Sequence, residues 1–223
     1  MLSLSLSRIL ASLASVALVM VAVIPHEVAH GWVAWKLGDP TAKEAGRLSL
    51  NPLKHLDPFG SVVLPLLMSL LGGPVFAYAK PVPYNPYRLR DERRDEVLVA
   101  LAGPACNLLE ALVSAILFRA LFTRWGGAQD ALYWVLVALS QFTYLNCGLA
   151  FFNLIPLPPL DGSKVISPLL SAQGRERYRM MQAYSMPVLI ILLYVLPSLA
   201  GIDPVSWYLD ATAYGLGGLL LGA

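Results

Sequence analysis

Charged residues are scarce in this chain. Asp, Glu, Lys and Arg make up 13% of its 223 residues, whereas a soluble domain carries about a quarter. Hydrophobic residues reach 57%, and the mean hydropathy is +0.63. Because so few ionisable side chains cannot cover a water-facing surface, much of the surface must face lipid. The composition therefore excludes an ordinary soluble enzyme or binding domain.

Polar linkers and low-complexity tracts are missing as well, and the chain has only two cysteines. Cys106 and Cys147 both lie in apolar runs, where a free thiol packs as a small hydrophobe. This disfavours a disulfide or a two-cysteine metal site. No segment marks off a soluble module, so we expect one membrane-embedded domain over residues 1–223. The first apolar stretch is longer than the core of a signal peptide, and we interpret it as a retained helix.

Long apolar stretches predict an all-α polytopic membrane protein. A helix needs about 20 apolar residues to cross a bilayer. We expect about five to six transmembrane helices, and the candidates are 9–35, 97–122, 131–155, 185–200 and 205–222. A short re-entrant or extended hairpin segment is expected near residues 36–96.

The stretch 59–76 is the ambiguous one, because it is short and contains Pro65. If it crosses the membrane, the basic loops on either side of it face opposite sides. If it dips in and returns, thirteen of the sixteen Lys and Arg lie on one face of the membrane, with Arg8 and Arg124 on the other face and Arg119 at a helix end. The positive-inside rule favours the second arrangement, with the basic side cytosolic. We therefore favour a re-entrant hairpin over a crossing.

Two histidines and a glutamate inside the first span carry the clearest chemistry. His26 and His30 are four positions apart, so both imidazoles project from one face of a helix. This spacing lets two nitrogens share one zinc ion, and the HExxH pattern makes Glu27 a general base. A packed, hydrogen-bonded histidine is the simpler alternative. However, ionisable groups are costly in a membrane helix, which favours function.

Catalytic zinc needs a third protein ligand. His55 lies in a turn-rich loop and is the weaker candidate. Asp161 follows a stretch with three prolines at the edge of the fourth apolar segment, where a carboxylate can face a polar cavity. Asp161-Gly162 could equally be a simple turn. The residues alone leave both possibilities open.

The paired motifs resemble those of the site-2 protease family of intramembrane zinc metalloproteases. They are residues 26–30 and the pattern of Asn153, Pro156, Asp161 and Gly162. A third element, residues 102–107, is similar to a family motif on the helix that lies between the other two motifs. The resemblance implies that Asp161 is the third ligand of Zn²⁺ and that the substrate is a membrane protein with a transmembrane helix. It also implies the compact bacterial branch without PDZ or CBS domains, in the cytoplasmic membrane.

Further expectations concern partners and the remaining polar residues. The partners are the lipid bilayer and the membrane-protein substrate, with no nucleic acid, and the oligomeric state stays open. Asn153 either contacts the substrate or transition state or caps its helix. Asn107 either contacts the substrate or ties helices together, as amides commonly do in membranes. Two other function classes compete: a zinc-binding membrane scaffold without protease activity, which would not need Glu27, and a transporter, which should show an inverted repeat.

Overall fold

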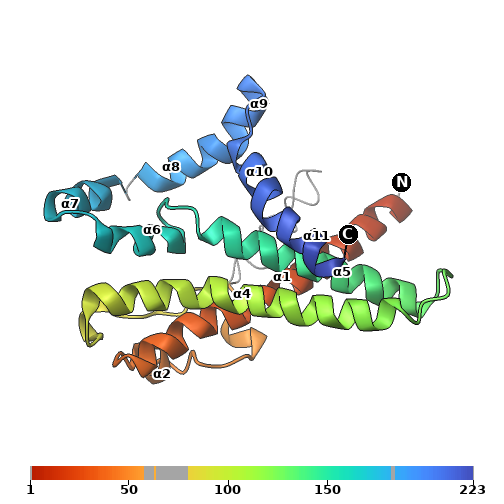
Figure 1. Cartoon of the computed structure of the whole chain (residues 1–223), viewed down its shortest axis with the longest axis horizontal. Helices are drawn as coiled ribbons and strands as arrows, with labels where there is room; N and C mark the ends of the chain where they lie inside the picture. The colour runs from red at the N-terminus through yellow and green to blue at the C-terminus, as the bar shows by residue number, and fades with distance from the viewer. Residues whose placement is uncertain (1, 58–62, 64–79, 182–183, 223) are drawn as a thin grey trace.

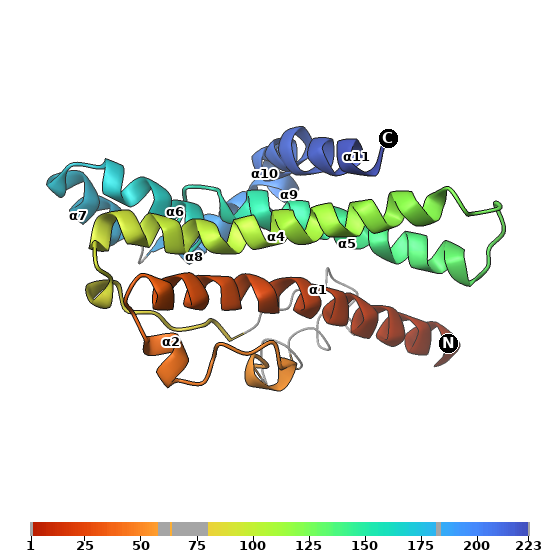
Figure 2. The same cartoon turned by 60° about the horizontal axis from the view of Figure 1, so that its bottom comes forward.

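The computed structural model describes residues 2–57, 63, 80–181 and 184–222. Three long helices dominate it: α1 (Leu2–Lys36), α4 (Glu92–Phe122) and α5 (Ala131–Asn153). The described residues contain no β-strand, which confirms the all-α prediction. Figure 2 shows the three helices lying side by side, with α1 and α5 running in the opposite direction to α4.

Local sequence sets the ends of these helices. Asp91 caps α4, because its carboxylate accepts hydrogen bonds from the backbone N–H groups of Arg93 and Arg94. Asp130 caps α5 in the same way through Tyr133 N. α1 stops before Gly38, whose φ of 115° suits a residue without Cβ. The capping aspartates thus mark the starts of α4 and α5.

Shorter elements fill in the remainder of the described chain. They are α2 (Thr41–Glu44), η1 (Pro52–Lys54), η3 (Pro86–Arg88), α6 (Asp161–Ile166), η4 (Ser167–Leu169), α7 (Ala172–Met181), α8 (Ser185–Ile190), η6 (Ile191–Val195), α9 (Leu196–Ala200), α10 (Pro204–Leu209), η7 (Asp210–Tyr214) and α11 (Gly215–Leu221).

Among the described residues, three helices are long and apolar enough to cross a membrane: Leu13–Lys36, Glu92–Phe122 and Ala131–Asn153. The two C-terminal stretches predicted as separate spans form one pair, Pro187–Ala200 and Pro204–Leu221, bent by 110°. They pass the length and composition test only together, so the described chain offers three spans or four. The predicted count of five to six is therefore not confirmed. The prediction for residues 59–76 lies almost entirely outside the described residues.

The packing and the surface both fit a membrane protein. Ala111, Cys147 and Ala213 form a buried cluster where α4, α5 and the last helices meet. Cys147 is free, in agreement with its predicted packing role. Large apolar side chains point outward instead, among them Leu109 on α4 and Trp134 on α5, which are 60% and 64% exposed. Apolar side chains exposed along helices long enough to cross a bilayer are typical of a surface that faces lipid. The chain is thus a multi-pass membrane protein.

The ends of the helices that carry the predicted site meet at one end of the bundle. The end of α1 lies next to the start of α4, because Arg90 N, just before α4, donates to Leu37 O, just after α1, at 3.1 Å. The end of α5 and the start of α6 lie at this same end (Figure 1). Two crossings, α4 and α5, therefore separate α1 from α6 and return the chain to its side.

Candidate metal centre

His26, His30 and Asp161 converge at the meeting point of α1 and α6. Nε2 of His26 and Nε2 of His30 are 3.0 Å apart, and Oδ2 of Asp161 lies 3.3 and 3.2 Å from them. All three residues are buried. In a tetrahedral zinc site with bonds of about 2.0–2.1 Å, neighbouring ligand atoms lie about 3.3 Å apart. The spacing of these three atoms therefore suits one zinc ion.

The other ring nitrogen of each histidine has a partner that fixes the tautomer. Nδ1 of His30 lies 2.6 Å from the carbonyl oxygen of Val99, which can only accept, so this nitrogen carries the proton. Nδ1 of His26 lies 2.5 Å from Oδ1 of Asn107. Both Nε2 atoms then present lone pairs toward the carboxylate of Asp161. Three acceptors that face one another at this distance need a cation among them.

Asn107 is oriented by a chain of hydrogen bonds across three helices. Its amide nitrogen donates to Asn146 Oδ1 at 2.7 Å and to Ala22 O at 3.3 Å, and Asn146 in turn donates to Phe142 O. The side-chain oxygen of Asn107 must therefore be the acceptor for His26. Asn107 is fully buried, and all its side-chain polar atoms have protein partners. This arrangement favours the helix-linking alternative over direct contact with substrate.

Gly103 leaves the room that a metal needs. It lies on α4 opposite α1, and a Cβ added there would sit 2.6 Å from His26 Nε2 and even closer to His30 Nε2. Any larger residue would displace the imidazoles or fill the space between them. Gly103 lies in the stretch 102–107 that carries part of the family resemblance, but no sequence pattern predicted that it would face the two histidines.

Asp161 is brought to the histidines by the turn that precedes α6. The three prolines between residues 156 and 159 end α5 and delay α6. Gly162 then packs on the backbone of Leu154 and Ile155, where a Cβ would overlap the Leu154 carbonyl. Oδ2 of Asp161 thereby lies 3.3 and 3.2 Å from Nε2 of His26 and Nε2 of His30. A carboxylate binds metal in its ionised form, so Asp161 would supply one negative charge to the centre.

Three further residues were predicted as site residues or weaker candidates: Glu27, Asn153 and His55. Glu27 is half-buried on α1, and its Oε2 accepts a hydrogen bond from Val82 N at 2.8 Å. Asn153 ends α5 and donates to Leu149 O one turn earlier. His55 is buried elsewhere, with Nε2 2.6 Å from Ser49 O, and does not belong to the converging group. Three residues of the site were not predicted. Val99 and Val82 act through backbone atoms, which a sequence pattern does not reveal. Asn146 acts through its side chain, but its contact with Asn107 joins two separate helices.

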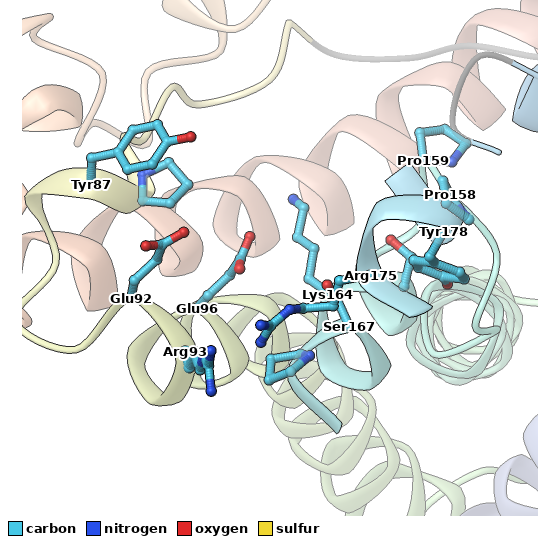
Figure 3. Close-up of a pocket in the computed structure, with 13 residues that line it drawn as sticks. Tyr87, Glu92, Arg93, Glu96, Pro158, Pro159, Lys164, Ser167, Arg175 and Tyr178 are labelled. Carbon is cyan, nitrogen blue, oxygen red and sulfur yellow. The ribbon is translucent and has the colours of Figure 1, made fainter. Parts of the chain in front are cut away.

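A polar cavity opens beside the centre, on the side of α6. Its volume is about 420 Å³, and the start of α4 faces α6 and α7 across it (Figure 3). Charged and hydroxyl groups line it, including Glu96, Lys164, Arg175 and Tyr178. The three converging residues do not line it, but Ser163 and Lys164 do, and Lys164 Nζ lies 3.9 Å from Asp161 Oδ1. The cavity therefore borders the metal centre through the first turn of α6.

Membrane helices around a His-His-Asp centre define a class of protein, the membrane-embedded metalloproteases. The sequence pattern of Peptidase family M50 matches residues 123–196, which include Asp161. The chain belongs to this family, the site-2 protease family, and is a zinc metalloprotease.

Three relatives support this assignment. "Putative zinc metalloprotease YwhC" of Bacillus subtilis is 39% identical over 176 residues, which cover 77% of this chain and 75% of the relative. "Putative zinc metalloprotease Rip2" of Mycolicibacterium smegmatis is 32% identical over 190 residues, covering 83% and 68%. "Putative zinc metalloprotease MJ0611" of Methanocaldococcus jannaschii is 31% identical over 142 residues, covering 63% and 62%. No solved structure matches the chain significantly.

Proposed function

We propose that this zinc metalloprotease hydrolyses a peptide bond within or near the transmembrane segment of a membrane-protein substrate. The observation that carries the proposal is the convergence of His26, His30 and Asp161 on one point of a membrane bundle. Two of these residues belong to a helix that is itself a candidate span. A substrate helix in the same bilayer can therefore come to the centre without leaving the membrane. Residues 1–223 would act as a single domain.

Each residue of the site has a role in this reaction. Zinc, held by His26, His30 and Asp161, would polarise the scissile carbonyl and acidify the attacking water. Glu27 accepts the proton of that water as the oxygen attacks the peptide carbon, and then passes the proton to the leaving amine. Asn107 and the Val99 carbonyl keep the two imidazoles in the tautomer that binds metal. Asn153 remains a predicted contact to the substrate backbone.

The substrate has to unwind before it can react. In a transmembrane helix every backbone group is already hydrogen bonded, so the scissile carbonyl is shielded. Gly and Pro residues lower the cost of opening a helix, because they weaken or remove its hydrogen bonds. We therefore expect preferred cleavage near such residues in the substrate.

The active site would open toward the cytosol from a bacterial cell membrane. The basic loops favour this orientation, since Arg88, Arg93 and Lys164 lie at the bundle end that carries the metal centre. The polar cavity beside α6 is at this end too, and its lining residue Lys164 lies 3.9 Å from Asp161, so water in the cavity would lie beside the centre.

A reconstituted reaction tests the proposal. The purified protein is placed in liposomes with a single-span reporter whose transmembrane helix contains Gly and Pro, and the products are mapped by mass spectrometry. Cleavage inside or next to the reporter's span, lost on zinc chelation and restored by added zinc, is the expected result. A matched reporter with a Leu-only span should be cut more slowly. If the protein binds zinc but cuts no membrane reporter, or transports zinc into the vesicles, the proposal is wrong.

A further inference from the structure

An extended segment that is remote in sequence contacts the predicted base. We call residues 80–85 the strap; they run alongside α1 before η3 (Figure 2). The backbone N–H of Val82 donates to Oε2 of Glu27 at 2.8 Å, and Val82 is buried. We propose that the strap positions the Glu27 carboxylate for proton transfer, with the Val82 N–H as the positioning group. This inference rests on the proposed role of Glu27 as general base.

The sequence of the strap leaves one backbone donor in its middle. Val82 stands between Pro81 and Pro83, and proline has no N–H. Pro83 also restricts Val82 to extended conformations. The N–H of Val82 is therefore presented on a stiff, extended backbone, and no neighbouring amide can replace it.

Both ends of the strap are fastened to other segments. At its start, Lys80 N donates to His55 O at 2.8 Å, and Arg47 donates to Lys80 O at 2.6 Å. At its end, Asn85 N donates to Asp39 Oδ2 at 2.5 Å. These anchors lie in the loop that follows α1, so the strap is fixed to the helix that carries Glu27. A hydrogen bond from a fixed backbone group restricts the carboxylate rotamer and leaves the second oxygen to exchange the proton.

Gly31 permits the strap to come this close. It lies one helical turn after Glu27, and a Cβ there would be 2.6 Å from Val82 Cγ1 and 2.9 Å from Ala42 Cβ. Val82 is stiff at χ1 and the Ala42 methyl is attached directly to the backbone, so neither can move aside alone. A side chain at position 31 would push the strap away from α1 and lengthen the bond to Glu27.

Replacing one amide hydrogen tests the inference. Val82→Pro removes the N–H and keeps an apolar side chain, whereas Val82→Ala keeps the N–H and loses side-chain bulk. We expect Val82→Pro to lower kcat on the Gly- and Pro-containing reporter by roughly 10- to 100-fold, with KM and bound zinc changed little. Val82→Ala should stay within about threefold of the wild type. Equal kcat values in the two variants would overturn the proposal.

A second variant covers the case in which Val82→Pro does not fold. Gly31→Ala leaves every hydrogen-bonding group in place and should lower kcat to a similar degree while zinc remains bound. If both substitutions act through the same hydrogen bond, the double variant should be no slower than the slower single variant. Full activity of a folded Gly31→Ala protein would contradict the inference. If the wild type cleaves no reporter, the proposed function fails first, so the two failures are distinguishable.

Discussion

Oδ1 of Asn107 lies 2.5 Å from Nδ1 of His26, although 81 positions separate the two residues in the chain. Asn107 donates in turn to Asn146, so the histidine on α1 is oriented by a network that reaches α5. Outer-shell groups of this kind hold the ring and the tautomer of a metal ligand. The network joins the packing of the bundle to the chemistry of the centre, because the helices must be in register for His26 to face the metal.

Asn107→Leu should weaken zinc binding about 10- to 100-fold, since it removes the acceptor that keeps the proton on His26 Nδ1. Competition with a zinc chelator measures the loss. Ser114→Ala is the matched control: Ser114 is buried on the same helix, two turns after Asn107, and its hydroxyl donates to Leu139 O at 2.8 Å rather than to a histidine. If both variants bind zinc as tightly as the wild type, Asn107 only ties helices together.

Asp161→Ala should lower zinc affinity by more than that outer-shell effect, because it removes one of three protein ligands. The metal content of the purified protein, determined by mass spectrometry, is the readout. Lys164→Met removes the cation 3.9 Å from Asp161 without removing a ligand atom, so this variant should retain zinc. Unchanged zinc in Asp161→Ala would rule out Asp161 as the third ligand.

Glu27→Gln should keep zinc and fold normally but cleave the reporter about 10²- to 10⁴-fold more slowly, because an amide cannot accept the proton of the attacking water. Glu110→Gln offers a matched change, since Glu110 is also a glutamate within a long apolar helix. It should cleave at close to the wild-type rate. Undiminished cleavage by Glu27→Gln would show that another group acts as the base.

Gly103→Ala should abolish stoichiometric zinc binding, although alanine favours helix formation by about 1 kcal/mol over glycine. The reason is the position of the new Cβ, 2.6 Å from His26 Nε2. Gly148→Ala on α5 is the control, because a Cβ there meets nothing within 4 Å. Zinc content and thermal unfolding are measured together. A Gly103→Ala protein with full zinc would show that the centre has more space than this geometry allows.

Asp39 should make the loop after α1 sensitive to acid. Burial would raise the pKa of Asp39, but hydrogen bonds from the Thr41 hydroxyl and the backbone N–H of Asn85 outweigh it and lower that pKa. A carboxyl whose folded pKa is lowered stabilises the fold fully above its unfolded pKa of about 3.9, and this contribution is lost as the pH falls through the folded value. Asp39→Asn should therefore unfold at a lower temperature than the wild type at pH 7. The difference should shrink as the pH falls below about 4, and a constant difference would contradict the assignment.

The distribution of apolar residues predicted the helical membrane architecture and the three longest spans. It did not predict that the two C-terminal stretches form one pair bent by 110°. Hydropathy reports whether a segment prefers lipid, but the direction of the chain after Gly201 depends on how α10 and α11 pack on α4 and α5. Gly217, which lies against the ring of Tyr144, is one of the contacts that set this packing.

By itself, the sequence determined the part of the candidate site that lies within one helix. His26 and His30 share a face of α1, with Glu27 to one side of it, because the helical repeat is a local property of the backbone. Only the tertiary structure decided the rest: that Asp161 closes the triad, that Asn107 and the Val99 carbonyl orient the imidazoles, and that the strap reaches Glu27. These contacts join distant segments, and they depend on how closely two backbones approach at Gly103 and Gly31. No local pattern encodes that distance, because it is the result of packing the whole bundle.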